Sequence, residues 1–155
     1  MKNEDYDLLI CGTGPLEESI QESIKEIETI KLMGQVEHHE LMNLLSNAKA
    51  LLFTSVLYET FGMTIIEAYS CGVPVIVNDI GNGAQLVINK ITGLKYRDGD
   101  KESLKKAIKK ILTLDLKENV LNEFEGKYTE DKNYRLLIEL YNLTTDKLSN
   151  FKNIN

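Results

Sequence analysis

Short apolar runs alternate with longer amphipathic stretches along the chain. The runs are nearly continuous, a pattern typical of strands that are buried on both faces of a parallel sheet. Each run is bounded by turn residues and followed by a segment with the apolar spacing of a helix. The predicted strands are LLIC (8–11), IKLMG (30–34), ALLFTS (50–55), PVIVND (74–79) and TGLKY (92–96).

The segments that follow these strands have the 3.6-residue period of amphipathic helices. We expect helices over about 16–25, 39–48, 62–71, 101–112, 116–127 and 130–147. The last helix places Leu136, Leu137, Leu140, Tyr141 and Leu143 on one broad apolar stripe. Strands that alternate with helices predict an α/β fold class, a single Rossmann-like, doubly wound parallel sheet. In such sheets the ligand site lies beyond the carboxyl ends of the strands.

Composition and charge narrow the class of partner. With 155 residues the chain is most simply one domain, and its formal net charge of −6 comes from 24 acidic against 18 basic residues. No basic stripe is visible, which argues against nucleic acid as the main partner. No apolar run approaches the length of a membrane span, and the N-terminus has no signal-peptide hydrophobic region. Cys11 and Cys71 are expected to be buried free thiols in a reducing compartment, which predicts a cytoplasmic protein.

The turn GTGP (12–15) follows the first predicted strand and invites comparison with a dinucleotide fingerprint. That fingerprint needs a third glycine where Glu17 stands, and a carboxylate there would repel a pyrophosphate. No acidic residue ends a clear second strand about 20 residues further on. We prefer the alternative, a tight strand-to-helix turn that uses Gly12 or Gly14 for its backbone angles.

The stretch YETFGMTIIEAYSCGVPVI (58–76) carries two glutamates in an apolar setting. Thr60 or Gly62 can cap a helix here, and Gly62 would leave the first amides open to a ligand because it has no side chain. Such amides carry partial positive charge and suit a phosphate. Glu59 would point into the same crevice, whereas Glu67 lies inside a buried helix and needs hydrogen-bond donors. Two vicinal ribose hydroxyls would supply them; the alternative is a backbone amide or a lysine that merely fixes the core.

The ordered motifs of this region resemble those of family 4 glycosyltransferases, which have the GT-B fold. The family pattern is a glutamate, seven residues, a second glutamate, then a small residue with Cys-Gly-x-Pro-Val-Ile and a glycine-bearing loop. Here the pattern reads Glu59, Glu67, Ser70-Cys71-Gly72, Pro74-Val75-Ile76, and Gly81 with Gly83. The flanks LLICGTGP, GQVEHHELMNLLSNAKALLFTS and ITGLKYRDGDKESLKKAI are similar as well. The resemblance therefore extends from about residue 7 to about residue 112.

The resemblance implies the donor-binding part of a retaining glycosyltransferase, which moves a hexose from a UDP- or GDP-linked sugar. It gives the catalytic role to Glu59, which would bind hydroxyls of the transferred sugar close to the reacting carbon. Glu67 would bind the ribose hydroxyls, and Val36 would contact the nucleobase through its backbone. The pyrophosphate would be received by the backbone amides of Phe61, Gly62, Met63 and Thr64. The resemblance implies neither a metal nor a cofactor.

Part of the family's site has no counterpart in this sequence. The family places an arginine and a lysine on the pyrophosphate from a strand–loop unit upstream of the G-x-G-P turn, but the first arginine here is Arg97. We therefore expect residues 1–155 to be a partial C-terminal donor-binding domain, inactive alone, that lacks the first strand unit and the N-terminal acceptor domain of the same enzyme. The acceptor could be a glycan, as in polysaccharide biosynthesis, or a lipid. A peripheral membrane acceptor would place the full-length enzyme at the inner face of the membrane.

A second class of function stays open on the same residues. A noncatalytic nucleotide-sugar-binding or partner-docking module could use this fold. Intact Glu59 and Glu67 favour the enzyme, because such a module has no need of the sugar-side carboxylate. Another GT-B enzyme, such as an epimerase or a phosphorylase, is a third alternative, although the sequence lacks the pyridoxal-lysine motif of a phosphorylase. We expect His38 and His39 to face solvent at a helix start rather than to act as ligands or bases.

Overall fold

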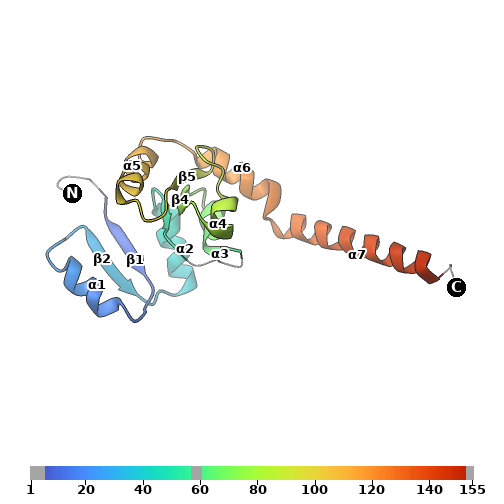
Figure 1. The fold of residues 1–155 in the computed structure, drawn as a ribbon, viewed down its shortest axis with the longest axis horizontal. Helices are drawn as coiled ribbons and strands as arrows, with labels where there is room; N and C mark the ends of the chain where they lie inside the picture. Colours follow the sequence, from blue (N-terminus) through green and yellow to red (C-terminus); the bar gives the residue numbers. More distant parts are fainter. Residues whose placement is uncertain (1–5, 57–60, 153–155) are drawn as a thin grey trace. The chain divides into compact units, whose positions relative to one another are not determined.

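The computed structural model describes residues 6–56 and 61–152, the last eight of these by their backbone alone. The chain divides into two compact units, Met1–Leu44 and Leu45–Asn155. The first unit contains β1 (Leu8–Cys11), α1 (Glu17–Ile24), β2 (Ile30–Gly34) and most of α2 (His38–Asn47). The elements of the second unit are β3 (Leu51–Phe53), α3 (Met63–Ser70), β4 (Val75–Asn78), α4 (Gly81–Leu86), β5 (Gly93–Tyr96), α5 (Lys101–Ile111), α6 (Lys117–Lys127) and α7 (Glu130–Lys152) (Figure 1).

Every strand pair in the described structure is parallel, as predicted. In the first unit β1 pairs with β2, and in the second the order is β3-β4-β5. The second sheet is in register from Leu51 through Val75 to Gly93. Each of the two units contains one parallel ladder, which confirms the predicted parallel α/β class.

The predicted helices are present, and α7 extends beyond its predicted end at residue 147. One helix was not predicted. Residues Gly81–Leu86 form α4, although the sequence indicated a glycine-bearing loop. Two glycines in six residues argue against a helix on propensity alone, since each costs about 1 kcal/mol relative to alanine. Packing of α4 on β4 overrides that local preference.

The hydrophobic core lies in the second unit. All four residues of β4 are buried. The helix α3 buries the four apolar neighbours of Glu67, which are Ile65, Ile66, Ala68 and Tyr69. The fully buried side chains of largest volume are Tyr69, Ile65, Ile76, Val75, Val77 and Val120. By contrast, none of residues 6–44 is buried. The expectation of two buried thiols is wrong, because Cys11 ends the poorly covered strand β1 and is exposed, while Cys71 is only half-buried after α3.

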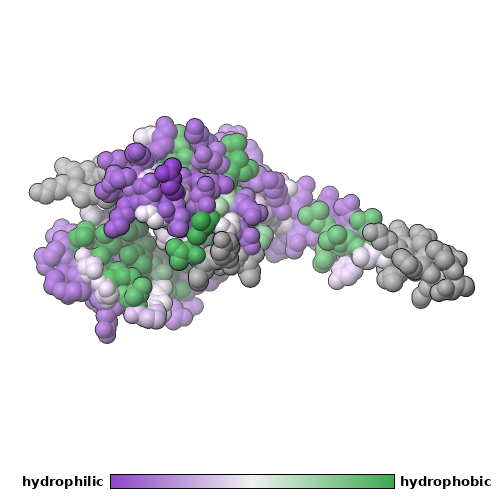
Figure 2. All heavy atoms as spheres, viewed as in Figure 1, coloured by the Kyte–Doolittle hydropathy of each residue, from purple (hydrophilic) through white to green (hydrophobic). Residues whose placement is uncertain are grey.

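The long helix α7 keeps its predicted apolar stripe exposed. Between 46% and 60% of the area of Leu136, Leu137, Leu140, Tyr141 and Leu143 is accessible. Figure 2 shows green hydrophobic side chains on the surface of the described part of α7, next to purple hydrophilic ones. Despite its 23 residues, α7 is not apolar enough to cross a membrane. None of the other helices in the described residues is long and apolar enough to do so either.

Candidate functional site

Three helices begin at one edge of the second sheet. Because β3, β4 and β5 are parallel, their last residues, Phe53, Asn78 and Tyr96, lie at the same edge. The helices α3, α4 and α5 each follow one of these strands and return antiparallel to it, so their N-termini face this carboxyl edge. The predicted location of a ligand site, beyond the carboxyl ends of the strands, is therefore surrounded by helix N-termini.

The helix α3 begins directly after Gly62, as the sequence predicted, and Gly62 itself is buried. Gly62 is its N-cap residue, with φ of +96°, a left-handed conformation that side chains rarely adopt. A Cβ added to Gly62 would lie 3.3 Å from Cδ1 of Leu86 on α4. Because the N-cap residue is a glycine, it makes no side-chain hydrogen bond to the first amides of this helix.

The other two helix N-termini at this edge are less suited to an anion. Asp100 caps α5, where its carboxylate Oδ1 accepts a 2.9 Å hydrogen bond from the amide of Ser103. The polar hollow beside it is internally neutralised, since Lys95 lies 3.6 Å from Asp79 and Arg97 lies 3.9 Å from Asp100. The third helix, α4, has only six residues, so fewer peptide dipoles add along its axis. The helix α3 differs from α5 in having no side-chain cap and from α4 in having eight residues.

Three of the predicted binding residues share one accessible face of α3. Met63 is exposed, Thr64 is half-buried, and Glu67, one turn after them, is also half-buried. Residues three and four apart on a helix are neighbours, so these three side chains form one stripe from the N-terminus of α3 to Glu67. Ile65, Ile66, Ala68 and Tyr69, which face the core, are buried. A molecule at the N-terminus of α3 could therefore also reach the carboxylate of Glu67.

Two predicted site residues, Glu59 and Val36, are not part of this face of α3. Glu59, the predicted catalytic residue, lies outside the described residues, as does Thr60, the alternative cap. Val36 is half-buried in the first unit, in the turn before α2, and its role toward a nucleobase stays a prediction. His38 and His39 are exposed at the start of α2, as expected.

Sequence reasoning missed a buried polar cluster behind α3. The Tyr69 hydroxyl donates toward Oγ1 of Thr92, at 2.7 Å, and toward the carbonyl oxygen of Leu86, at 3.1 Å. Thr92 Oγ1 also accepts a 2.9 Å hydrogen bond from the amide of Ile88. Burial raises the pKa of Tyr69 to about 12, so its hydroxyl stays protonated throughout the neutral range. A tyrosine in an otherwise apolar helix was the available signal, because a buried tyrosine hydroxyl needs a partner.

An aromatic row also reaches the N-terminus of α3. The ring of Tyr128, which follows α6, lies 6.3 Å from that of Tyr69 and 6.4 Å from that of Phe61, measured between centroids. The Phe61–Tyr128 pair is edge-to-face, an arrangement that stabilises aromatic pairs beyond their buried area. Phe61 is nevertheless 45% exposed, so one side of its ring stays accessible beside Gly62.

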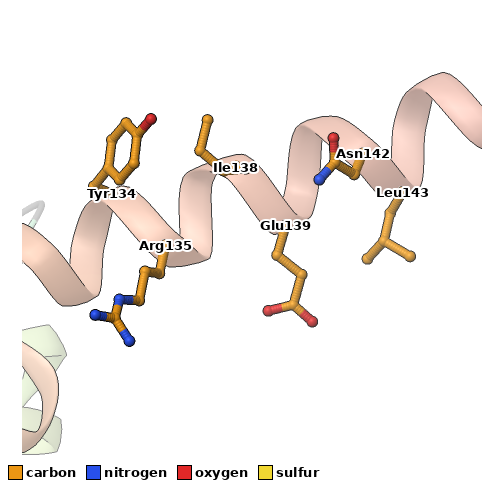
Figure 3. Close-up of a pocket in the computed structure, with 6 residues that line it drawn as sticks. All are labelled: Tyr134, Arg135, Ile138, Glu139, Asn142 and Leu143. Carbon is orange, nitrogen blue, oxygen red and sulfur yellow. The ribbon is translucent and has the colours of Figure 1, made fainter.

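Two other features do not form a site. The hollow along α7 is lined by side chains of that helix alone, and Figure 3 shows them pointing to different sides without an opposing element. Within the described residues, no group of three His, Cys, Asp or Glu side chains could hold a metal ion. Two acidic residues near β4 have hydrogen-bonding roles. Oδ1 of Asp98 accepts a 2.7 Å hydrogen bond from the side-chain amide of the buried Asn78, and Asp100 caps α5.

Comparison with curated proteins places relatives among glycosyltransferases. The chain is 30% identical over 108 residues to glycogen synthase from Mycobacterium tuberculosis, a match that covers 68% of this chain and 26% of that protein. It is 31% identical over 114 residues to the 2-deoxystreptamine N-acetyl-D-glucosaminyltransferase of Niallia circulans, with 72% and 29% covered. The chain thus spans little more than a quarter of the length of these relatives.

Solved structures with the same fold have the GT-B architecture. Sucrose-phosphate synthase from Thermosynechococcus elongatus superposes with a TM-score of 0.78 at 26% identity, over 91% of this chain and 39% of that one. Anabaena Alr3699/HepE, solved in complex with UDP and glucose, gives a TM-score of 0.75 at 18% identity, over 88% and 40%. The family model described as glycosyl transferases group 1 matches residues 1–126, and the chain belongs to this glycosyltransferase family.

Proposed function

We propose that this chain holds the donor of a retaining glycosyltransferase, which transfers a hexose from a nucleotide-diphosphate sugar to a glycan, lipid or other acceptor. The observation that carries the proposal is the glycine-capped N-terminus of α3, with the half-buried Glu67 about one turn below it on the face that also carries Met63 and Thr64. Structural neighbours solved with UDP or UDP-glucose support a donor of this chemical class.

The diphosphate is assigned to the amides of Phe61, Gly62, Met63 and Thr64. Free N–H groups at a helix start donate to phosphate oxygens, and the helix dipole adds about half a positive charge there. As the bond from the anomeric carbon to the phosphate oxygen breaks, the leaving diphosphate gains negative charge. Amides that already point at this position stabilise the transition state without reorganising.

The two glutamates have different roles in this proposal. Glu67 accepts hydrogen bonds from the two ribose hydroxyls, since a carboxylate offers acceptor sites for both. Glu59 binds hydroxyls of the transferred sugar, where its negative charge offsets the positive charge that develops on the sugar ring. Val36 contacts the nucleobase through backbone groups, and no metal takes part.

The acceptor and the rest of the enzyme lie outside this chain in the proposal. The matches cover only 26% and 29% of the two curated relatives, so those proteins are much longer than this chain. We propose that a preceding strand–loop unit of the same polypeptide supplies cations for the diphosphate and that a separate acceptor-binding domain completes the site. The 155-residue chain would then bind its donor weakly and have no transferase activity by itself.

Isothermal titration calorimetry of the chain with UDP-glucose and GDP-mannose, with and without chelator, tests donor binding. We expect weak binding to one of them that chelator does not change. Binding that requires added Mn²⁺ would contradict the metal-free proposal. The absence of binding to both nucleotide sugars would contradict the claim that this chain binds its donor without the rest of the enzyme.

Substitution of each glutamate in the full-length enzyme separates the two roles. Glu67→Gln should weaken donor binding by roughly 10- to 150-fold, the effect of losing about 1.5 to 3 kcal/mol from a charged hydrogen bond. Glu59→Gln should reduce kcat much more than donor affinity, because its charge matters most in the transition state. The matched control is Glu118→Gln, an exposed residue on α6, which should change neither.

Two results would favour other interpretations. If Glu67→Gln lowers the melting temperature but leaves the affinity of the folded protein unchanged, Glu67 is a structural carboxylate. If Glu59→Gln leaves turnover intact, the catalytic assignment is lost. An enzyme without turnover that still binds the nucleotide sugar would point to the noncatalytic module.

A further inference from the structure

The buried Tyr69 connects three segments that are distant in sequence. Its exposed fraction is 0%, and Thr92, its closest hydrogen-bond partner, is also fully buried. Through its hydroxyl it reaches the carbonyl of Leu86, the last residue of α4. The last carbonyls of a helix have no partner within the helix, so this contact satisfies a group that would otherwise be unpaired.

The contact with Leu86 reaches back to the start of α3. The Leu86 carbonyl oxygen accepts a hydrogen bond from the Tyr69 hydroxyl. The Leu86 side chain lies beside Gly62, because a Cβ added to Gly62 would be 3.3 Å from Leu86 Cδ1. Tyr69 is near the C-terminal end of α3, and Gly62 is its N-cap residue. The hydroxyl, α4 and Gly62 therefore form a closed path that fixes the N-terminal turn of α3 against α4.

A second path runs through the ring of the same residue. Tyr69 contacts Tyr128, and Tyr128 contacts Phe61, the residue before Gly62. The two paths leave Tyr69 through different atoms, the hydroxyl and the ring. Tyr69→Phe removes the first path while it keeps the ring of the second.

We infer that Tyr69 is a positioning residue for the phosphate-binding turn of α3, an inference that rests on the proposed function for its role in donor binding. It does not touch the donor. Its hydroxyl holds Leu86, and Leu86 sets the place of Gly62 and hence the direction of the amides of Met63 and Thr64. A shift of these amides weakens hydrogen bonds to a phosphate, since such bonds lose strength steeply as their angle departs from linear.

Amide hydrogen exchange followed by NMR on the ligand-free chain tests the positioning role directly. The Ile65 amide, which donates to the Gly62 carbonyl at 3.0 Å, reports on the first turn of α3. In Tyr69→Phe we expect its exchange to be roughly tenfold faster. The matched control is Val120→Ala, which creates a cavity at a fully buried position on α6 and lowers global stability without removing any group of the hydrogen-bonded cluster.

Substitutions at Thr92 provide the internal check. Thr92→Val keeps the shape but removes the hydroxyl and should accelerate exchange at Ile65, whereas Thr92→Ser keeps the hydroxyl and should leave it near the wild-type rate. If Tyr69→Phe and Val120→Ala accelerate Ile65 exchange equally at equal loss of global stability, Tyr69 is merely structural and the inference is overturned.

Titration with UDP and with GDP distinguishes this inference from the proposed function. We expect one of the two nucleotides to bind the wild-type chain and to bind Tyr69→Phe roughly 5- to 100-fold more weakly. If the wild type binds neither nucleotide while Ile65 exchange responds as expected, donor binding by this chain fails and the positioning of the turn stands. If both proteins bind the nucleotide equally, donor binding stands and the role of Tyr69 in it is overturned.

Discussion

Strands β1 and β4 are similar in sequence and differ completely in burial. Both have four residues, LLIC and VIVN, and both belong to parallel ladders. All of β4 is buried, whereas only Ile10 of β1 is even half-buried. Strand β4 has a hydrogen-bonded neighbour on each side and packs against α4 and α5, while β1 has one neighbour, β2. Figure 2 shows the difference as a green apolar surface over the β1-β2 pair.

The difference in burial between β1 and β4 shows which strands support the candidate site. A parallel sheet is normally covered on both faces, and β4 and most of β5 meet this condition, while β3 is half-buried. The N-terminus of α3 and the cluster around Tyr69 lie next to these covered strands. Substitutions in β4 and β5 should therefore disturb the site strongly, and comparable substitutions around β1 should be tolerated.

The largest effect is expected from Gly93→Ala. An added Cβ would lie 1.9 Å from the carbonyl oxygen of Val75 on β4, and a clash with backbone cannot be relieved by a rotamer change. We expect the second unit to lose its cooperative thermal transition, measured by circular dichroism. The control is Gly14→Ala, where no atom lies within 4 Å, and the free energy of unfolding should change by less than about 0.5 kcal/mol. Equal melting temperatures for both variants would contradict the comparison.

Truncation of one apolar side chain in each sheet should give the next largest difference. Ile76 on β4 is 1% exposed, so Ile76→Ala should lower the free energy of unfolding by about 2 to 5 kcal/mol. Leu9 on β1 is 38% exposed, and Leu9→Ala should cost roughly half as much or less, because less area leaves water on folding. Urea denaturation measures both values. A larger loss for Leu9→Ala would mean that β1 is covered in solution.

Alkaline pH should destabilise the covered unit through Tyr69. Its pKa is about 12 in the folded protein, and the usual value for an unfolded chain is near 10. Between these values the unfolded chain loses the proton and the folded one keeps it. The free energy of unfolding therefore falls as pH rises from about 10 to 12, by about 2 to 3 kcal/mol. This contribution is absent in Tyr69→Phe. Denaturation of both proteins at pH 9 and above pH 11 should therefore show that the wild type loses its advantage in free energy of unfolding over Tyr69→Phe as the pH rises. Parallel curves would contradict the pKa.

The smallest effect is expected for the ion pair between Asp7 and Lys31 beside β1. Both side chains are about half exposed, and exposed ion pairs contribute roughly 0 to 1 kcal/mol. Asp7→Asn should change the free energy of unfolding by less than that, and the change should vanish in molar salt because salt screens exposed charges. Denaturation at low and high salt measures it. A loss that persists at high salt would indicate that the pair is shielded from water.

Much of the local structure could be predicted from the sequence. Apolar runs located all five strands, and the glycine before MTII located the N-terminus of α3, because both signals depend on neighbouring residues. The accessible stripe with Glu67 follows from helical spacing on the same short segment. The helix α4 escaped prediction, since its two glycines disfavour a helix locally and only packing on β4 stabilises it.

The sequence by itself thus determined the order and type of most elements, the parallel α/β class and the start of α3 at Gly62. Tertiary structure alone decided that VIVN is buried while LLIC is not, and that Tyr69 meets Leu86 and Thr92. The physical reason is the range of the interactions. Propensity, capping and periodicity act over a few residues, whereas burial and the partners of a buried hydroxyl depend on segments that approach only when the chain is folded.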